Sequence, residues 1–310
     1  MRVAVAGATG VLGRALVPKL IAAGHSPRLL VRNVAKAQEL FLGLPGEIFE
    51  CDLLSPQCRE GRVAQLIDGC QGLIHAATAI PADPSAPGAW TRNTLLRIRG
   101  TGRLERAALA AGAEVFLCQS IIMAYPDGGD VWLDENTHID SSPERHDVCH
   151  AVGIMESMIW LLRKHPSQMR WGILKGGIFV GPGTFQERTV EQIRHGELVV
   201  PGEGLHFISP VHVDDVAEAY VLALQKAPRQ SVFNICAEPI RYGEYVDALA
   251  DSIGAPRPRR DRSQAKPASH RASNAKAREQ LGWSPRHSIF PPDELALVSD
   301  EVRKSNGEVQ

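Results

Sequence analysis

The stretch RVAVAGATGVLGRAL, residues 2–16, decides the fold class of this chain. An apolar run typical of a β-strand leads into a glycine turn, and a stretch of helical character follows from Val11. A turn without side chains lets the backbone approach a pyrophosphate, while the free N–H groups at the start of the helix face the phosphates. Gly13 would let that helix pack closely on a sheet. The segment therefore predicts dinucleotide binding, with a tight turn that binds nothing as the alternative.

The same alternation continues along the first half of the chain. Apolar runs at residues 28–32, 47–52, 72–78, 114–120 and 170–180 alternate with helical stretches at residues 11–23, 34–42, 90–111 and 148–164. Short apolar strands that alternate with helices indicate a parallel sheet covered on both faces. We therefore predict an α/β protein with a Rossmann-type, doubly wound parallel sheet.

The pattern loosens after Gly183, which divides the chain into two predicted parts. Residues 1–181 form the dinucleotide-binding Rossmann domain, completed by a strand near residues 231–236, and residues 182–310 form mainly a smaller α/β substrate-binding region. In the second part we expect helices at residues 211–224 and 242–252, a loop at residues 255–273 and a polar tail after residue 300.

Four polar residues of the second part need an interpretation. Asp214 and Asp215 stand at a predicted helix start, so we interpret them as capping and helix-dipole residues and not as paired catalytic carboxylates. His206 and His212 stand nearby, but nothing in the pattern assigns them to a substrate cleft.

The composition is that of an ordinary globular protein. The chain has 310 residues, 44% of them hydrophobic and 22% charged, with a formal net charge of -1, so no overall field attracts nucleic acid or an acidic membrane. No apolar run approaches the roughly 18 residues that span a bilayer, and the N-terminus lacks the features of a signal peptide. The six cysteines show neither C-x-x-C pairs nor metal-ligand spacing. We therefore predict reduced thiols, no metal, a cytoplasmic location and a small-molecule substrate.

The residue at the end of the second predicted strand selects the cofactor. An acidic residue there would pair with the ribose 2′-hydroxyl and indicate NAD, but the position carries Arg32. A guanidinium can pair with the 2′-phosphate of NADP through its planar fork, and Arg14 and Lys36 add positive charge nearby. The pattern favours NADP(H) over NAD(H), with a solvated arginine at a strand end as the alternative.

Further cofactor-binding residues are predicted at the carboxyl ends of the parallel strands, where such sheets bind ligands. Asp52 ends the third strand and is suited to accept from the adenine amino group, and small residues at the end of the fourth strand let a cofactor lie against the backbone. The full predicted set is Gly7, Thr9, Gly10, Val11, Leu12, Gly13, Arg32, Asp52, Leu53, Ala76, Ala77, Thr78, Ser120 and Lys175.

Taken together, these segments resemble a known family, the extended short-chain dehydrogenases/reductases of the NAD-dependent epimerase/dehydratase type. The resemblance covers nearly the whole chain. It is carried by GATGVLG (7–13), CDLLSP (51–56), DGCQGLIHAAT (68–78), RGTGRLERAALAAG (99–112), LKGGIFVGPGT (174–184), SPVHVDDVAEAYVLAL (209–224) and LGWSPRHS (281–288). It implies a homodimer formed through the two long helices.

The resemblance also implies a catalytic Ser or Thr after the fifth strand and a Tyr-x-x-x-Lys motif on the next helix. In the family the Tyr transfers the substrate proton, and the Lys lowers its pKa and holds the nicotinamide ribose. Placing Glu156 at the family's acidic position puts Val148 at the Tyr position and Val152 at the Lys position. Neither valine can transfer a proton. Arg97 stands where the family usually has an Asn in the long helix.

Three residues are predicted to take over the catalytic work: Ser120, Tyr125 and His150. Ser120 holds the position of the catalytic hydroxyl if one residue is inserted before Tyr125, and otherwise Ile121 holds it. The second candidate, Tyr125, stands where the family's equivalent residue usually shapes the substrate pocket. His150 follows the Tyr position by about half a turn, and a histidine can donate a proton near neutral pH. The alternative is that His150, like His146, is a surface residue at a helix start.

The leading functional hypothesis is an NADP(H)-dependent oxidoreductase or epimerase-like enzyme that acts on a small polar carbonyl or hydroxyl substrate by an atypical mechanism. The alternative is a non-catalytic protein that holds NADP(H) as a regulatory or redox-sensing partner, as the loss of Tyr and Lys would allow. A scaffold without any cofactor is a third hypothesis, which the retained Gly7, Gly10 and Gly13 disfavour.

Overall fold

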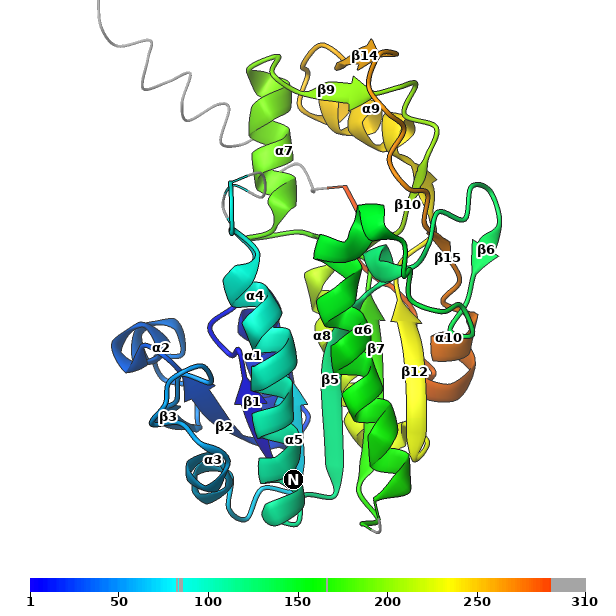
Figure 1. Cartoon of the computed structure of the whole chain (residues 1–310). Coiled ribbons are helices and arrows are strands. Elements are labelled where there is room, and N and C mark those ends of the chain that lie inside the picture. The colour runs from blue at the N-terminus through cyan, green and yellow to red at the C-terminus, as the bar shows by residue number, and fades with distance from the viewer. Residues whose placement is uncertain (82, 84–85, 166, 291–310) are drawn as a thin grey trace, which may run out of the picture.

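A parallel seven-stranded sheet forms the centre of the computed structural model, which describes residues 1–81, 83, 86–165 and 167–290. The strand order is β12-β7-β5-β4-β1-β2-β3 (Figure 1). The strands are β1 (Arg2–Ala6), β2 (Ser26–Val31), β3 (Glu47–Glu50), β4 (Gly72–His75), β5 (Val115–Ile121), β7 (Arg170–Gly176) and β12 (Gln230–Ile235). The order reverses direction between β1 and β4, which confirms the predicted Rossmann-type fold and places a ligand crevice at the carboxyl ends of these two strands.

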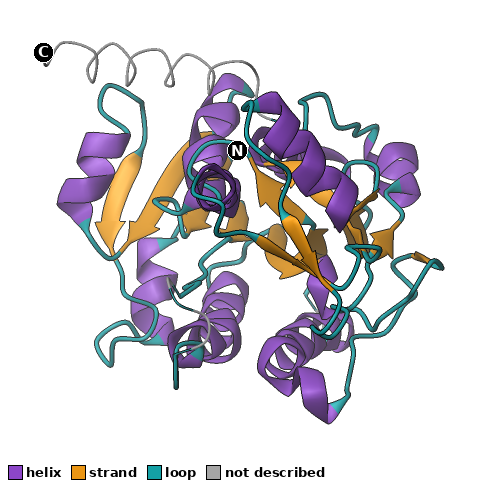
Figure 2. Cartoon of the chain, turned by 90° about the horizontal axis from the view of Figure 1, so that it is seen from above, coloured by secondary structure: helices purple, strands orange, loops and turns teal. Residues whose placement is uncertain are grey.

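Helices cover both faces of the sheet (Figure 2). One face carries α1 (Val11–Ala22), α2 (Val34–Leu40), α8 (Val213–Lys226) and α10 (Ala275–Leu281). The other carries α3 (Glu60–Leu66), α4 (Thr91–Leu95), the π-helical turn η1 (Leu96–Gly100), α5 (Thr101–Ala110) and α6 (His146–Leu161). Each face encloses its own hydrophobic cluster, so the inner strands are buried on both sides, whereas the edge strand β3 is partly exposed.

Helix α1 shows how the sequence pattern produces this packing. Leu12, Leu16 and Leu20 recur every four residues and are buried between the sheet and α8. The helix ends before Gly24, whose positive φ of 77° matches the predicted helix stop. The buried face of α1 therefore fixes the position of the glycine turn that precedes it.

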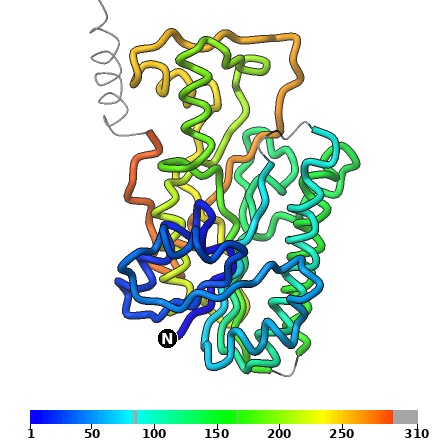
Figure 3. Tube along the Cα trace, turned by 90° about the vertical axis from the view of Figure 1, so that its left-hand side faces the viewer, coloured from blue at the N-terminus to red at the C-terminus, as the bar shows by residue number. Residues whose placement is uncertain are grey.

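A smaller region lies beyond the carboxyl ends of the strands (Figure 3). Its elements are α7 (Phe185–Arg194), β9 (Val199–Pro201), β10 (Phe207–Ile208), β13 (Ile240–Arg241), α9 (Tyr242–Ser252) and β14 (Arg259–Asp261). They enclose a third hydrophobic cluster, to which α7 and α9 contribute most of the buried side chains. The region is therefore placed to cover whatever binds at the crevice.

The structure corrects the sequence prediction for residues 255–273. This segment was expected to be a loop, but it contains β14, which pairs with β9, and β15 (Arg271–Ala272), which pairs with β6 (Trp132–Leu133). These strands are two or three residues long, which is too short for a periodic sequence signal. The helices α3 and α7 were not predicted either, because each buries only two or three side chains.

The run at residues 170–180 was predicted as one strand and is in fact two. The chain leaves the central sheet at Gly177 and continues as β8 (Ile178–Val180), which pairs with β11 (Pro210–His212). A Cβ atom at Gly177 would overlap the carbonyl oxygen of Ser209. Because glycine has no Cβ, the chain can pass this point and enter the smaller region.

The prediction of six reduced thiols is wrong for two of the cysteines. Cys51 and Cys58 form a disulfide, because the chain between them folds into turns that bring the end of β3 next to the start of α3. Such local closure has no characteristic spacing in the sequence. The free thiols are those of Cys70, Cys118, Cys149 and Cys236, all buried.

Among the described residues, no helix combines the length and the hydropathy that crossing a bilayer requires. The polar tail predicted to fray after residue 300 lies outside the described residues.

Candidate cofactor and substrate site

The glycine turn brings three backbone segments into close contact. Gly7 adopts a positive φ of 93°, and a Cβ atom on it would lie 2.5 Å from the amide nitrogen of Ala77 and 2.6 Å from the carbonyl carbon of Ala76. A Cβ atom on Gly13 would overlap the carbonyl group of Ala8. The turn therefore needs glycine on steric grounds at both places, and it packs directly against the end of β4.

The first turn of α1 leaves its amide groups available. Gly10 occupies the N-cap position, so no side chain caps the helix, and the first turn has no acidic residue. Thr9 and Val11 are partly exposed beside it, whereas the Leu12 side chain belongs to the core and only its backbone could face a ligand. Free amides and a positive helix-dipole end are the features that a pyrophosphate needs. The first turn of α1 therefore has the geometry that the sequence prediction requires, and its contact with a cofactor stays a prediction.

At the end of β2 the side chain of Arg32 is exposed and makes no hydrogen bond or ion pair with the rest of the described chain. Asn33, directly after it, caps α2 by accepting from the amide of Lys36 at 2.9 Å. Since β2 pairs with β1 and Leu30 is in register with Ala6, Arg32 follows β2 at the same edge of the sheet as the glycine turn. An exposed guanidinium without a partner can pair with a phosphate group.

Asp52 and the end of β4 lie around the same crevice. Asp52 accepts from the amide of Leu54 at 3.0 Å and forms an ion pair with Arg92 of α4 at 3.2 Å. The Leu53 side chain is buried. At the end of β4, Ala77 and Thr78 are partly exposed, while Ala76 is buried. These positions could therefore offer one carboxylate and a stretch of backbone to a ligand.

Two predicted site residues, Ser120 and Lys175, are bound to other parts of the protein instead of facing the crevice. Ser120 of β5 donates its hydroxyl hydrogen to Glu156 of α6, and the Lys175 ammonium of β7 donates to the same carboxylate at 2.8 Å. Ser120 and Lys175 are paired in the sheet register, so neighbouring strands present them together. All three side chains are buried. Ser120 and Lys175 therefore belong to a buried ionic network with Glu156. Their contact with the cofactor stays a prediction.

Tyr125 is also enclosed. Its ring lies 4.6 Å from the Lys175 ammonium, and its hydroxyl donates to Asn234 of β12 at 2.9 Å. Burial, the largest cause, raises the pKa of the Tyr125 hydroxyl well above its usual range. A hydroxyl held in this way is a poor proton donor near neutral pH.

Helix α6 carries no tyrosine and no lysine. Val152 is fully buried among apolar side chains, and Val148 packs partly buried at the edge of the same cluster. His150 is exposed and stacks on His146 with 4.3 Å between ring centroids. The two histidines line a pocket of about 460 Å³ together with residues 86–91. His150 is therefore accessible to a ligand in that pocket, while its catalytic role stays a prediction.

A buried cation, Arg97, lies in the π-helical turn next to the crevice, and the sequence did not indicate a role for it. Arg97, in the π-helical turn η1, is only 3% exposed, and its guanidinium donates to the sulfur of Met155 at 3.6 Å. Burial and the nearby Arg97 charge lower the pKa of His75, at the end of β4, to about 4. π-Helical turns are frequent at functional sites. Only burial distinguishes Arg97 from the other arginines of this helix, and sequence does not report burial.

A pocket of about 240 Å³ lies between the central sheet and the smaller region. Its lining is mostly apolar, and its polar members are Arg145, His206, Ser209, Tyr242 and His270. Burial is the largest cause that lowers the pKa of both histidines, so each is neutral near pH 7. The pocket therefore combines an apolar surface with the guanidinium of Arg145, which is ion-paired with Asp140 at 3.3 Å.

The structure also corrects the capping roles at the start of α8. The N-cap is His212, whose Nδ1 accepts from the amide of Asp214 at 3.2 Å. Asp215 is buried and accepts from the amides of Arg286 and His287, each at 3.0 Å. It therefore attaches the C-terminal segment to α8, a role that sequence could not show because the partners are far apart along the chain.

The fold is that of a Rossmann-type protein with a glycine turn at the topological switch point, and the comparisons with known proteins agree. A sequence profile of the NAD dependent epimerase/dehydratase family matches residues 3–236. A 3-diazoavenalumate denitrifying reductase from a Streptomyces species is 31% identical over 308 residues, which cover 93% of this chain and 97% of the relative. The chain belongs to the NAD-dependent epimerase/dehydratase family, as its motifs indicated.

Two more distant proteins are also similar to this chain. A 2-alkyl-3-oxoalkanoate reductase from Stenotrophomonas maltophilia is 25% identical, with 83% of this chain and 77% of the relative covered. The crystal structure of a UDP-glucose 4-epimerase from Thermus thermophilus in complex with NAD superposes with a TM-score of 0.77 at 20% identity, and the match covers 100% of both chains. At that identity the likeness shows the fold alone.

Proposed function

We propose that this chain is an NAD(P)-dependent reductase that acts on a small substrate in the pocket of about 240 Å³ and works without the Tyr-x-x-x-Lys pair. The observation that carries the proposal is the glycine turn, where a Cβ atom at Gly7 would overlap the end of β4 and the first amides of α1 remain uncapped. When bound there, a nicotinamide dinucleotide supplies or accepts a hydride. The Gly7–Gly13 turn would hold its pyrophosphate and Asp52 its adenosine.

The free guanidinium of Arg32 supports a preference for NADP(H). Replacing Arg32 with Asp removes the cation and places a carboxylate where the 2′-phosphate would lie. Because a hydrogen bond to a charged group contributes about 1.5–3 kcal/mol, we expect NADPH affinity to fall by about 10- to 100-fold while NADH affinity is kept or improved. Fluorescence titration of both reduced cofactors measures the ratio.

The control for this change is Arg62→Asp, which makes the same change of charge at an exposed position of α3. It should leave the ratio of the two affinities as it is in the wild type. A wild-type protein that prefers NADH, or an Arg32→Asp variant that still prefers NADPH, would refute the role given to Arg32.

If the substrate is a small polar carbonyl or hydroxyl compound, as the sequence suggested, the reaction requires a source of a proton. Reduction of a carbonyl needs a proton as well as a hydride. Helix α6 supplies no acid at the positions of the missing motif, and the Tyr125 hydroxyl is committed to Asn234. What the pocket offers is Arg145, whose guanidinium is ion-paired with Asp140 at 3.3 Å and would donate its remaining N–H groups to a developing oxyanion or a substrate carboxylate. The proton would then come from water.

A second candidate substrate class needs no acid at all, and one observation favours it. The relative at 31% identity is named for reductive removal of nitrogen from a diazo compound. A cationic diazo compound would accept a hydride, that is one proton and two electrons, from the reduced nicotinamide, which becomes oxidised. A C–H bond forms, the C–N bond breaks and N2 leaves, so no proton from the protein is required. A pocket with an apolar lining and Arg145 suits a diazo carboxylate. Such a reaction would not need the acid that the missing Tyr-x-x-x-Lys motif would supply on α6.

The test is deuteride transfer from NADPH labelled at C4. The full-length protein is incubated with a panel of small carbonyl compounds and diazo carboxylates, and the products are analysed by mass spectrometry. We expect deuterium at the reduced carbon of at least one product. Tight NADPH binding without label in any product would instead support the non-catalytic, regulatory function.

A further inference from the structure

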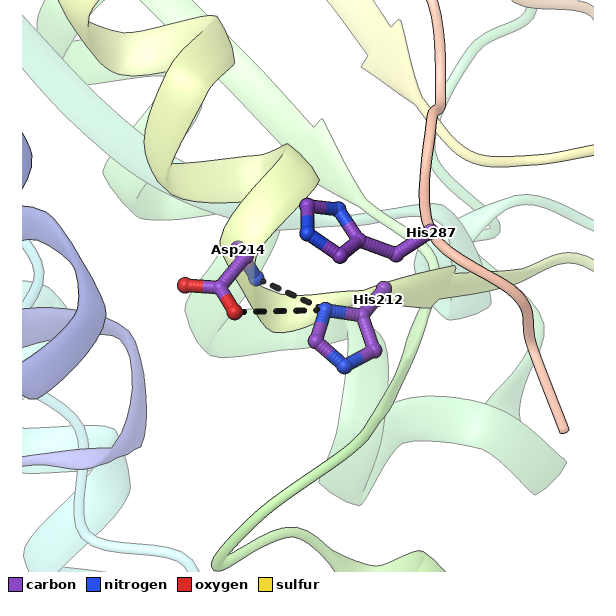
Figure 4. A group of neighbouring side chains, drawn as sticks. All are labelled: His212, Asp214 and His287. Atoms are coloured by element: carbon purple, nitrogen blue, oxygen red, sulfur yellow. Dashed lines mark hydrogen bonds and ion pairs between the residues drawn. The ribbon is translucent and has the colours of Figure 1, made fainter. Parts of the chain in front are cut away.

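Two histidines and one carboxylate from distant parts of the sequence meet at the start of α8 (Figure 4). His212 ends β11, Asp214 lies in the first turn of α8, and His287 belongs to the segment that follows α10. One ligand atom from each lies within 4.8 Å of the others. We propose that His212, Asp214 and His287 bind a divalent transition-metal ion, with Zn²⁺ the best match. The proposal is independent of the proposed function.

The buried carboxylate of Asp215 prepares His287 for this role. Asp215 Oδ1 lies 2.7 Å from His287 Nδ1, and a carboxylate can only accept, so Nδ1 carries the hydrogen. The lone pair of His287 is therefore on Nε2, which Figure 4 shows directed to the same side as the Asp214 carboxylate. A histidine ligand that donates its other N–H to a carboxylate is the usual arrangement around bound metal ions.

His212 is held with its Nδ1 toward the same point. On the opposite side of the ring, Nε2 faces Gly181, where a Cβ atom would overlap it. Nδ1 lies 3.6 Å from Asp214 Oδ2 and accepts from the Asp214 amide at a long 3.2 Å. A metal ion would take over this lone pair at the cost of one weak capping hydrogen bond.

The ligand set matches the chemistry of zinc. Two imidazoles and one carboxylate, with the fourth position left open, are a recurring Zn²⁺ ligand set. Zn–N distances near 2.0 Å put ligand atoms roughly 3.3 Å apart, so the side chains must draw together by about 1.5 Å. The His287 ring, stacked on His212 with 4.7 Å between centroids, must also turn so that both lone pairs meet at the ion. The Asp214 and His287 side chains are 38% and 46% exposed and have room for this movement. The bound ion would join the C-terminal segment to α8, next to the tether already formed by Asp215.

A second histidine pair must be removed before the test. His146 and His150 stand one turn apart on α6, and two histidines at this spacing can themselves chelate a metal ion. We therefore use His150→Gln as the parent protein. Zn²⁺ is titrated by calorimetry into the chelator-treated, full-length parent. We expect one equivalent to bind with a Kd of about 10 µM or tighter.

Variants in this parent decide the outcome. His287→Gln and Asp214→Asn should each weaken Zn²⁺ binding at least about tenfold, while Asp147→Asn, an exposed acid beside His146, should leave it unchanged. The melting temperature of the parent should rise by about 5 °C at a hundredfold excess of Zn²⁺ over Kd, and the His287→Gln variant should lack this rise. A parent that takes up no Zn²⁺ below roughly 100 µM, or a His287→Gln variant with parental affinity, overturns the proposal.

Discussion

Gly7→Ala is expected to abolish measurable binding of NADPH and NADH and to lower the free energy of unfolding by about 3 kcal/mol or more. Two effects add. The residue holds a positive φ of 93°, which strains any residue with a side chain, and the new methyl group would lie 2.5 Å from the Ala77 amide nitrogen. Backbone atoms of β4 cannot move aside as a flexible side chain would. The turn must shift instead, and the amides of α1 lose their arrangement around the pyrophosphate.

Gly24→Ala is the matched control for this change. Gly24 has a comparable φ of 77°, but no atom lies within 4 Å of its ideal Cβ position. It therefore carries the conformational strain without the overlap, at a cost of about 1–2 kcal/mol and with cofactor affinity intact. Urea unfolding and fluorescence titration of both variants separate the two effects. If Gly7→Ala binds NADPH as the wild type does, the turn is not the cofactor cradle.

Sequence predicted the part of the molecule in which neighbours along the chain are also neighbours in space. The glycine turn joins β1 to α1 directly, so its position between a strand and a helix could be predicted from residues 2–16. Strand and helix alternation gave the sheet for the same reason. The chain leaves the sheet at Gly177, where only glycine fits against the Ser209 carbonyl, and no local pattern contains that contact.

The candidate site was harder to predict because its contacts are long-range. Ser120 and Lys175 come together only through the register of β5 on β7, and their shared partner Glu156 arrives from α6. From the sequence alone, a Ser and a Lys at strand ends are interpreted as ligands for a cofactor. His212 and His287 likewise meet only after α10 has packed beside α8.

Lys175→Met is expected to destabilise the protein by about 3–5 kcal/mol, because it leaves the Glu156 carboxylate buried without its cation. The ammonium and the carboxylate are 2.8 Å apart, and their side chains are 3% and 8% exposed, so water does not replace the lost partner. Urea unfolding followed by circular dichroism measures the change. Unchanged stability would contradict the buried ion pair.

The double variant Lys175→Met/Glu156→Gln tests whether Lys175 has any further role. A neutral amide beside the introduced methionine removes the buried charge and can still accept from the Ser120 hydroxyl, so more than half of the lost stability should return. NADPH titration of this variant then separates two interpretations of the lysine. If Lys175 acts only within the network, affinity matches the wild type. If the sequence-based prediction of cofactor contact holds, affinity stays low although stability has recovered.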